Sequence, residues 1–328
     1  MGAHLTLAIT SLLVAGSALV ACRLDTTAVL TPGNSADPGP ADAAPGGDAT
    51  LGGFVIELVG AVVEHGVEKA PAYTGVMGKI FDGPTPAPVA WKVVAEGGGC
   101  RLLAPTVPFC NPGCGGGAAC VEGGTCVRYP SAVSLGRVHV KGLAGGDFDM
   151  AEVGGNYQPT ARIPYPPLPE GGKVEITAPG GSLGPLRLES VGIAPLELTS
   201  RVQPISGQPL ALAWIPPAHA HSSRIEVTMD LSHHGGSKGK IDCDVADTGS
   251  LEIPAAPIAA LMALGISGYP SVVVTRVASG GTATRLGRAT LRVVASVERA
   301  VEIEGLHSCT ANEHCPAGMT CQVDLKCK

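Results

Sequence analysis

The positions of the cysteines constrain this chain more than any other feature. Eleven of its 328 residues are cysteines. Eight of them form two groups with similar spacing, which are Cys110, Cys114, Cys120 and Cys126, and Cys309, Cys315, Cys321 and Cys327. In both groups the last three cysteines are separated by five residues, and a glycine (Gly117 or Gly318) stands three positions after the second cysteine. A unit of fewer than twenty residues buries too little apolar surface to be stable by itself, so we expect two disulfides in each.

Three pairings are open within each group, and we expect the first cysteine to pair with the third and the second with the fourth. Outside the groups, the alternation in residues 240–245 places Cys243 on an apolar face with Ile241 and Val245. A long-range disulfide between Cys100 and Cys243 is therefore expected. Zinc is the alternative for the two groups, but structural zinc sites have cysteine steps of two to four residues. The wider steps and an oxidising compartment favour disulfides.

The eleventh cysteine follows an apolar N-terminal segment. Residues 5–21 form an uncharged run of 17 residues that ends in Leu19-Val20-Ala21-Cys22, the order of a secretory signal peptide, although the preceding MGAH contains no Lys or Arg. This sequence resembles the lipobox of bacterial lipoproteins. The resemblance implies that Cys22 becomes the first residue of the mature chain and is acylated on its sulfur and its amine, which anchors the protein to a membrane. An ordinary cleaved signal peptide, with Cys22 as a free or paired thiol, is the alternative.

Two further segments indicate what lies between the anchor and the folded part. Residues 31–50 are rich in Pro, Gly, Ala and Asp and contain no aromatic residue, so they are expected to form a disordered tether. Residues 253–275 are uncharged and long enough to span a membrane, but they contain three prolines. These breakers predict instead a helix over 258–266 with Pro257 near its first position, a turn over 268–270, and a strand over 272–277, all in the core.

Short runs of β-type sequence dominate the rest of the chain. We expect strands near 54–59 and 90–94, and then at 137–140, 173–177, 186–191, 196–202, 210–215, 224–231, 240–245, 271–277, 289–294 and 301–304. Residues 224–231 alternate polar and apolar side chains throughout, which predicts a strand with one wet face. Aromatic residues make up only 3% of the chain, so the core must consist of aliphatic side chains. The pattern predicts an all-β chain with an antiparallel β-sandwich-like domain.

These observations predict six segments along the chain. They are a signal peptide (1–21), a flexible tether (22–50), a short β region (51–99), a first Cys-rich module (100–130), a β-sandwich domain (131–305) and a second Cys-rich module (306–328). The net charge of −6 with thinly spread basic residues excludes the electrostatic footprint of a nucleic-acid-binding protein. No Walker loop, GxGxxG, HExxH or c-type haem motif occurs, so no cofactor is expected.

Histidines provide the first candidates for chemistry. His219 and His221 would share a face of an extended chain, which suits a metal ion. The pair His233 and His234 lies beyond the strand at 224–231, so the two groups would stand about 23 Å apart along that strand and could not bind one ion. The pair fits a hairpin turn with solvated imidazoles better, and no metal site is predicted.

Aspartates and one serine provide the others. Asp242, Asp244 and Asp247 form D-x-D-x-x-D, which lacks the glycine and distal glutamate of a calcium loop, and Asp242 and Asp244 are expected to face solvent. Asp247 begins a D-T-G-S sequence like that of pepsin-like proteases, but those enzymes need a second carboxylate, no second such motif is present, and only a homodimer of the retroviral type could supply one. Residues 180–184 match G-x-S-x-G, but prolines on both sides indicate a glycine turn without a nucleophile.

The lipobox, the tether and the modules CNPGCGGGAACVEGGTC and CTANEHCPAGMTCQVDLKC together resemble cell-envelope lipoproteins of the myxobacterial type. That resemblance implies an exported, lipid-anchored protein of the cell envelope, with the outer membrane favoured over the inner. We expect a non-enzymatic binding or structural role at the cell surface, with an extracellular protein or polysaccharide as partner and no nucleic acid. Trp91 and Trp214, the only tryptophans, are candidates for stacking on a sugar, although Trp214 fits the core better. An envelope hydrolase or metal-dependent enzyme using His219, His221 or Asp247 is the alternative.

Overall fold

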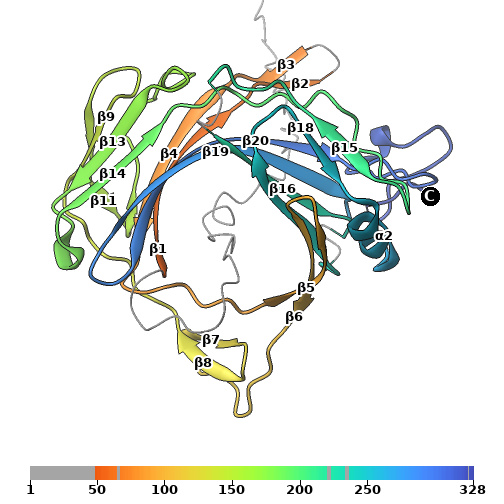
Figure 1. Ribbon diagram of the computed structural model, residues 1–328, viewed down its shortest axis with the longest axis horizontal. Helices are drawn as coiled ribbons and strands as arrows, with labels where there is room; N and C mark the ends of the chain where they lie inside the picture. Colours follow the sequence, from red (N-terminus) through yellow and green to blue (C-terminus); the bar gives the residue numbers. More distant parts are fainter. Residues whose placement is uncertain (1–48, 65–66, 220–222, 233–235, 324) are drawn as a thin grey trace, which may run out of the picture. The chain divides into compact units, whose positions relative to one another are not determined.

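One large sheet organises the protein in the computed structural model, which describes residues 49–64, 67–219, 223–232, 236–323 and 325–328. Its ten strands, in spatial order, are β11 (Glu152–Val153), β12 (Asn156–Tyr157), β4 (Tyr73–Ile80), β1 (Thr50–Val59), β20 (Arg288–Ala300), β19 (Ser271–Ala283), β16 (Arg224–Asp230), β17 (Lys240–Ala246), β6 (Cys100–Thr106) and β5 (Ala90–Gly97). Figure 1 shows the long strands β19 and β20 in the middle of this sheet, between β1 and β16.

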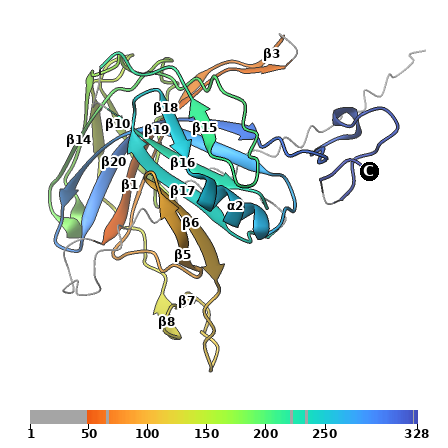
Figure 2. The same ribbon diagram turned by 45° about the vertical axis from the view of Figure 1, so that its right-hand side comes forward.

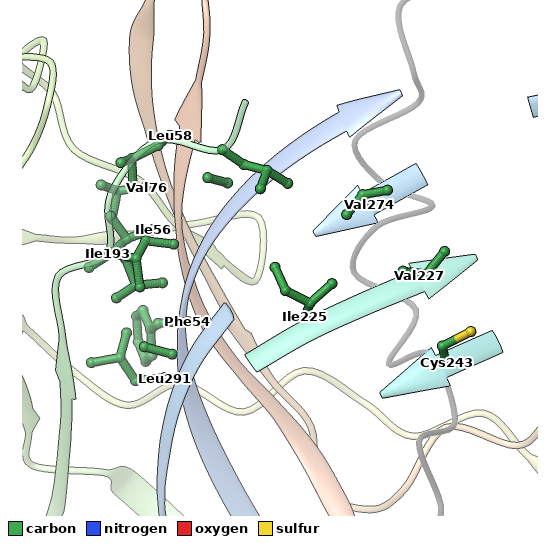
Figure 3. Close-up of a cluster of buried hydrophobic side chains, with 14 of the residues drawn as sticks. Phe54, Ile56, Leu58, Val76, Ile193, Ile225, Val227, Cys243, Val274 and Leu291 are labelled. Carbon is green, nitrogen blue, oxygen red and sulfur yellow. The ribbon is translucent and has the colours of Figure 1, made fainter. Parts of the chain in front are cut away.

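Alternating side chains produce the core face of this sheet. In β16, Ile225, Val227 and Met229 are buried. In β1, Phe54, Ile56 and Leu58 are buried, and Figure 3 shows these three beside Val76 of β4, Leu291 of β20 and Ile193. A side-chain period of two places every second residue of a strand on the same face, so the core consists of aliphatic side chains with few rings.

A second, four-stranded sheet packs against the first. Its order is β10 (Phe148–Met150), β9 (Val138–Lys141), β13 (Lys173–Ala178) and β14 (Leu186–Val191). The Ser190 hydroxyl of β14 donates to the Ala278 carbonyl of β19 over 3.1 Å. At Gly280 an added Cβ would lie 1.7 Å from the Glu189 carbonyl oxygen, so only glycine lets the two strands approach this closely. The packing of two sheets agrees with the predicted sandwich-like all-β class.

Small elements complete the fold. Three two-stranded sheets pair β15 (Leu210–Ala213) with β18 (Ser250–Ile253), β2 (Val62–Glu64) with β3 (Val67–Ala70), and β7 (Ala118–Val121) with β8 (Thr125–Arg128). The helices are α2 (Ala255–Ala263) and the 3₁₀ turns η1 (Gly181–Leu183) and η2 (Asn312–His314). Figure 2 shows α2 beside β17 and β6. Among the described residues, no helix is long and apolar enough to cross a membrane.

Two predicted strands are absent. Residues 196–202 contribute only the isolated bridge between Leu198 and Trp214, and residues 301–304 only the bridge between Ile303 and Leu306. In the second case the Leu306 N–H donates to the Ile303 carbonyl, which closes a tight turn. Local β-type sequence is present in both segments, but the first makes only a few backbone hydrogen bonds beside β15, including Thr199 N–H to the Ala213 carbonyl, and does not extend them into a ladder.

Two other expectations are corrected in detail. The helix occupies 255–263 instead of 258–266, and Pro257 is its third residue. The prolines at 254 and 257 both fit the first turn, where backbone N–H groups have no intrahelical partner. The large sheet also contains one parallel pair, because β1 lies alongside β20 in the same direction. All its other strand pairs are antiparallel.

The segments expected from the sequence meet inside this architecture. β1, β4 and β5 come from the short β region (51–99), and they share one sheet with β16, β17, β19 and β20 of the segment 131–305. Cys100 and Leu102 of β6 are buried in the common core. The chain segments on both sides of the first Cys-rich module therefore build one sandwich.

Candidate functional site

Asp247, the strongest catalytic candidate of the sequence, is buried in a polar network. Its side chain is 1% exposed. One carboxylate oxygen, Oδ1, accepts hydrogen bonds from Trp214 Nε1 (2.7 Å) and Arg276 Nη2 (3.2 Å). The other, Oδ2, accepts from Ser223 Oγ (2.6 Å) and Arg276 Nε (2.6 Å). Neither oxygen is left to contact a substrate, so Asp247 has a structural position.

Arg276 connects this network to the backbone of two other segments, at residues 194–195 and at residue 215. Its side chain is 1% exposed. Besides Asp247, it donates from Nη1 to the carbonyls of Ala194 (3.3 Å) and Pro195 (2.9 Å) and from Nη2 to that of Ile215 (2.6 Å). All five guanidinium N–H groups are thus used, which a buried arginine requires.

The network also decides the protonation of Asp247. Burial by itself raises the pKa of the carboxyl, but the hydrogen bonds from Arg276, Ser223 and Trp214 outweigh burial and hold the pKa below its usual value. The group is therefore a carboxylate at neutral pH. Trp214, 3% exposed, is a core residue as expected, and its indole N–H is committed to Asp247.

The histidine candidates fall in two classes. His221, His233 and His234 lie outside the described residues. His219 is described, and its backbone N–H donates to Glu170 Oε1 over 2.7 Å. Among the described residues, the groups that could hold a metal ion consist of cysteines alone.

Asp242 and Asp244 lie on the face of β17 opposite the core. Asp244 pairs with Arg224 Nε (2.6 Å) and is half exposed. Asp242 is more enclosed than expected, since its side chain is 23% exposed and binds Lys240 Nζ (2.7 Å) and the Thr228 hydroxyl (2.8 Å). The Lys240 ammonium also lies 4.8 Å from the centre of the Trp91 ring, so one face of this ring makes a cation–π contact within the protein.

The ten cysteines among the described residues form five disulfides. They are Cys100–Cys243, Cys110–Cys120, Cys114–Cys126, Cys309–Cys321 and Cys315–Cys327. Both modules thus pair first to third and second to fourth, and Cys100 and Cys243 are directly opposite each other on β6 and β17. Cys22, the eleventh, lies outside the described residues. With their sulfurs in disulfides, the module cysteines offer no thiolate to zinc.

Residues 180–184 form the glycine turn expected from the flanking prolines. Gly180 and Gly181 both have positive φ, and η1 occupies 181–183. The carbonyl of Ser182 accepts a hydrogen bond from Arg285 Nη2. A strand, β14, and not a helix follows the turn, so the nucleophile elbow is absent here.

A cleft that the sequence did not predict lies beside the proline-rich segment 159–165, next to the loop between β9 and β10. It consists of two adjoining hollows, of about 100 Å³ and 390 Å³, that share Arg162, Ile163 and Pro164. The smaller hollow is also lined by Phe148, Pro159 and the loop 144–146. The larger is lined by Ala72 and Tyr165, and its volume is in the range of small-molecule sites.

Local sequence explains how the cleft forms. The segment 158–169 contains five prolines, which lack backbone N–H groups and cannot continue a sheet. Ile163 enters the core, and the Thr74 hydroxyl of β4 donates to the Pro164 carbonyl over 2.8 Å. Across the smaller hollow, Gly145 has φ of +96°, and a Cβ there would lie 3.3 Å from Pro164. Glycine therefore keeps the hollow open.

The side chains of this cleft are suited to a ligand. Arg162 is exposed and makes no hydrogen bond or ion pair with any residue that the structure describes. Phe148 and Tyr165 are half-buried against the core and expose part of their rings, and burial raises the pKa of the Tyr165 hydroxyl. The chain has eleven aromatic residues, and two of them line this cleft together with a guanidinium that has no partner among the described residues, which makes it the candidate binding site.

A third hollow, of about 420 Å³, lies between β13, β14 and β19. Three of its charged side chains form one network, because Arg187 Nη2 lies 2.6 Å from carboxylate oxygens of both Glu175 and Glu189; the fourth charged residue of its lining is the exposed Lys173. The arginine neutralises two carboxylates that stand directly opposite each other on the strands. No aromatic side chain lines this hollow, whereas Phe148 and Tyr165 line the cleft at Arg162, so that cleft is the better candidate site.

The sequence contained one signal for the cleft. The proline-rich run around Arg162 and Tyr165 interrupts the strand pattern between 140 and 173, and such a loop is a common place for binding residues. Phe148 and Gly145 could not have been assigned to it, because the pairing of β9 with β10 brings them there.

Comparisons with known proteins add little. No family model matches the chain, and no curated protein matches it. Among solved structures, the chain is similar to the FN1–FN3 domains of chicken CNTN1, with 11% identity, coverage of 70% of this chain and 72% of that chain, and a TM-score of 0.17. A score this low carries no argument about this protein. The five disulfides themselves fit a domain that folds in an oxidising, extracytoplasmic compartment.

Proposed function

We propose that this protein is an exported lipoprotein of the cell envelope, anchored by acyl groups on Cys22, and that its β-domain has a non-enzymatic binding role at the cell surface. The outer membrane is the favoured location, and an extracellular protein or polysaccharide is the partner. The proposal combines the lipobox-like sequence before Cys22 with the disulfide framework of the folded part.

The observation that carries the anchor is the use of the cysteines. Of the eleven cysteines, ten are consumed by five disulfides within the described residues. The remaining one is the cysteine that ends the lipobox-like sequence. An odd cysteine in an exported chain needs another use, and acylation supplies it.

The binding role is supported by the contrast between the candidate residues. Asp247, which an enzyme of the aspartic class would need, has both oxygens saturated by Trp214, Ser223 and Arg276. The cleft at Arg162 offers an unpaired cation and aromatic walls, which recognise a ligand without providing a nucleophile. A hydrolase is therefore not favoured by the candidate residues described.

The test is the substitution Cys22→Ser in the full chain expressed in a bacterium. We expect the wild type in the membrane fraction with a mass increased by acyl groups, and the variant in the soluble fraction without them. The matched control replaces Cys114 and Cys126 together by Ser, which removes a module disulfide and keeps Cys22, so that this variant should remain acylated and membrane-bound. A Cys22→Ser protein that sediments with membranes as the wild type does would overturn the anchor.

A further inference from the structure

We propose that the cleft at Arg162 binds an N-acetylated amino sugar, as a free saccharide or as a unit of a larger glycan. This inference rests on the proposed binding role and names the ligand class for it. The two adjoining hollows correspond to the two parts of such a sugar, the acetamido group and the ring.

The smaller hollow suits the acetamido group. Its volume is about 100 Å³, about a quarter of that of the larger hollow. Its walls from Phe148, Pro159 and Ile163 are apolar and suit a methyl group. The space has room for the few heavy atoms of an acetamido group and excludes a second sugar ring.

The larger hollow suits the ring. At about 390 Å³ it accommodates a pyranose, and the half-buried Tyr165 provides an aromatic surface for the C–H face of the sugar. The alternation of polar hydroxyls and apolar C–H faces in a sugar matches an aromatic wall beside a hydrogen-bond donor.

Arg162 stands between the two hollows and lines both. Its guanidinium offers five donors and no acceptor, and none of these donors is used by another described residue. An acetamido carbonyl and the ring hydroxyls are acceptors within one sugar unit. A charged donor makes a stronger hydrogen bond to them than a neutral one does, which favours a sugar that carries a carbonyl beside its ring.

The experiment is a calorimetric titration of the full chain in mild detergent with N,N′-diacetylchitobiose. The comparison ligands are the same disaccharide without acetyl groups, and cellobiose. We expect saturable binding of the acetylated sugar and affinity at least about ten-fold weaker for both others, which corresponds to a loss of about 1.4 kcal/mol when the acetyl groups are absent.

Two variants place the binding in the cleft. Arg162→Gln changes an exposed side chain without touching the core and should weaken the acetylated sugar about ten-fold. Phe148→Ala should weaken the affinity for the acetylated sugar and reduce the ratio of this affinity to that for cellobiose. A thermal melt shows whether this variant is folded. Arg299→Gln, which removes an exposed cation at the end of β20, is the matched control and should bind as the wild type does.

The outcomes separate this inference from the proposed function. Equal affinity for cellobiose would overturn the acetamido assignment, and failure of all three sugars to bind at millimolar concentration would overturn the ligand class. Binding that Arg162→Gln leaves unchanged would overturn the site. Each of these results leaves membrane anchoring through Cys22 intact, because that is measured by fractionation and mass alone.

Discussion

Arg276 and Arg162 have opposite surroundings, although the sequence around each is ordinary. Arg276 is almost completely buried, and its five N–H groups bind Asp247 and three backbone carbonyls. Arg162 is exposed in a cleft and binds no described residue. A buried cation must be paired because desolvation is expensive, whereas an exposed one remains hydrated until a ligand arrives. The difference separates a residue that holds the fold from one that is available for recognition.

The largest loss of stability is expected when the buried pair of Asp247 and Arg276 is disrupted. Asp247→Asn leaves the Arg276 cation buried without a counter-charge, and we expect a loss of about 3–5 kcal/mol in the free energy of unfolding. Urea denaturation measures it. Asp244→Asn is the matched control, because Asp244 also pairs with an arginine but is half exposed, and it should cost about 1 kcal/mol or less. Equal losses in the two variants would contradict a special role for the buried pair.

Low pH should also leave Arg276 without a counter-charge in the wild type, because it protonates Asp247. The pKa of Asp247 is lowered in the folded protein, so the carboxylate stabilises the fold fully at pH above its unfolded pKa. This contribution is lost as the pH falls through the lowered pKa. The gap in unfolding free energy between wild type and Asp247→Asn should therefore be constant near neutral pH and shrink below about pH 4. Denaturation curves from pH 7 to pH 2.5 test this, and a gap that stays constant would show that Asp247 does not titrate as argued.

Removing one neutral donor from the network should cost less. Trp214→Phe deletes the indole N–H that binds Asp247 Oδ1, while Arg276 and Ser223 still hold the carboxylate. We expect a loss of about 1.5–3 kcal/mol. Trp91→Phe is the control, since Trp91 is half-buried beside Lys240, and it should lose less. If thermal melts showed the two variants to be equally stable, the hydrogen bond would have no measurable part in stability.

The smallest effect is expected at the exposed arginine. Arg162→Gln should change the free energy of unfolding by no more than about 0.5 kcal/mol, as is usual for surface positions. Arg276→Gln in the same assay should be strongly destabilised, because it leaves the Asp247 carboxylate buried without a counter-charge. A large loss of unfolding free energy in Arg162→Gln would mean that this side chain stabilises the fold. It would then have a partner within the protein and would not be available for recognition.

Local pattern was enough to predict several elements. The run 186–191 is β14 without any change of boundary, and 224–231 differs from β16 by one residue. Strict alternation succeeds there because one face is buried and the other is wet. It failed at 196–202, which forms only an isolated bridge between Leu198 and Trp214 and directly follows two residues whose carbonyls accept hydrogen bonds from Arg276. The tertiary contact outweighed the local β preference.

The candidate site was less accessible to prediction. The sequence singled out Asp247 through its D-T-G-S motif but did not indicate that the residue is buried. Burial follows from Trp214 and Ser223, which lie 33 and 24 residues away. The cleft was not predicted at all, since its lining combines Ala72, the loop 144–146, Phe148 and the segment 159–165, which are far apart in the sequence.

The sequence by itself determined the all-β class, the presence of two four-cysteine modules and the lipobox-like position of Cys22, because alternation, cysteine spacing and a short motif act over a few residues, whereas the pairing within each module was one of three possibilities. Only the tertiary structure decided the parallel pairing of β1 with β20, the burial of Asp247 with Arg276, and the exposure of Arg162. These depend on which distant segments displace water from a side chain. Solvation is a property of the assembled fold, and no local pattern encodes it.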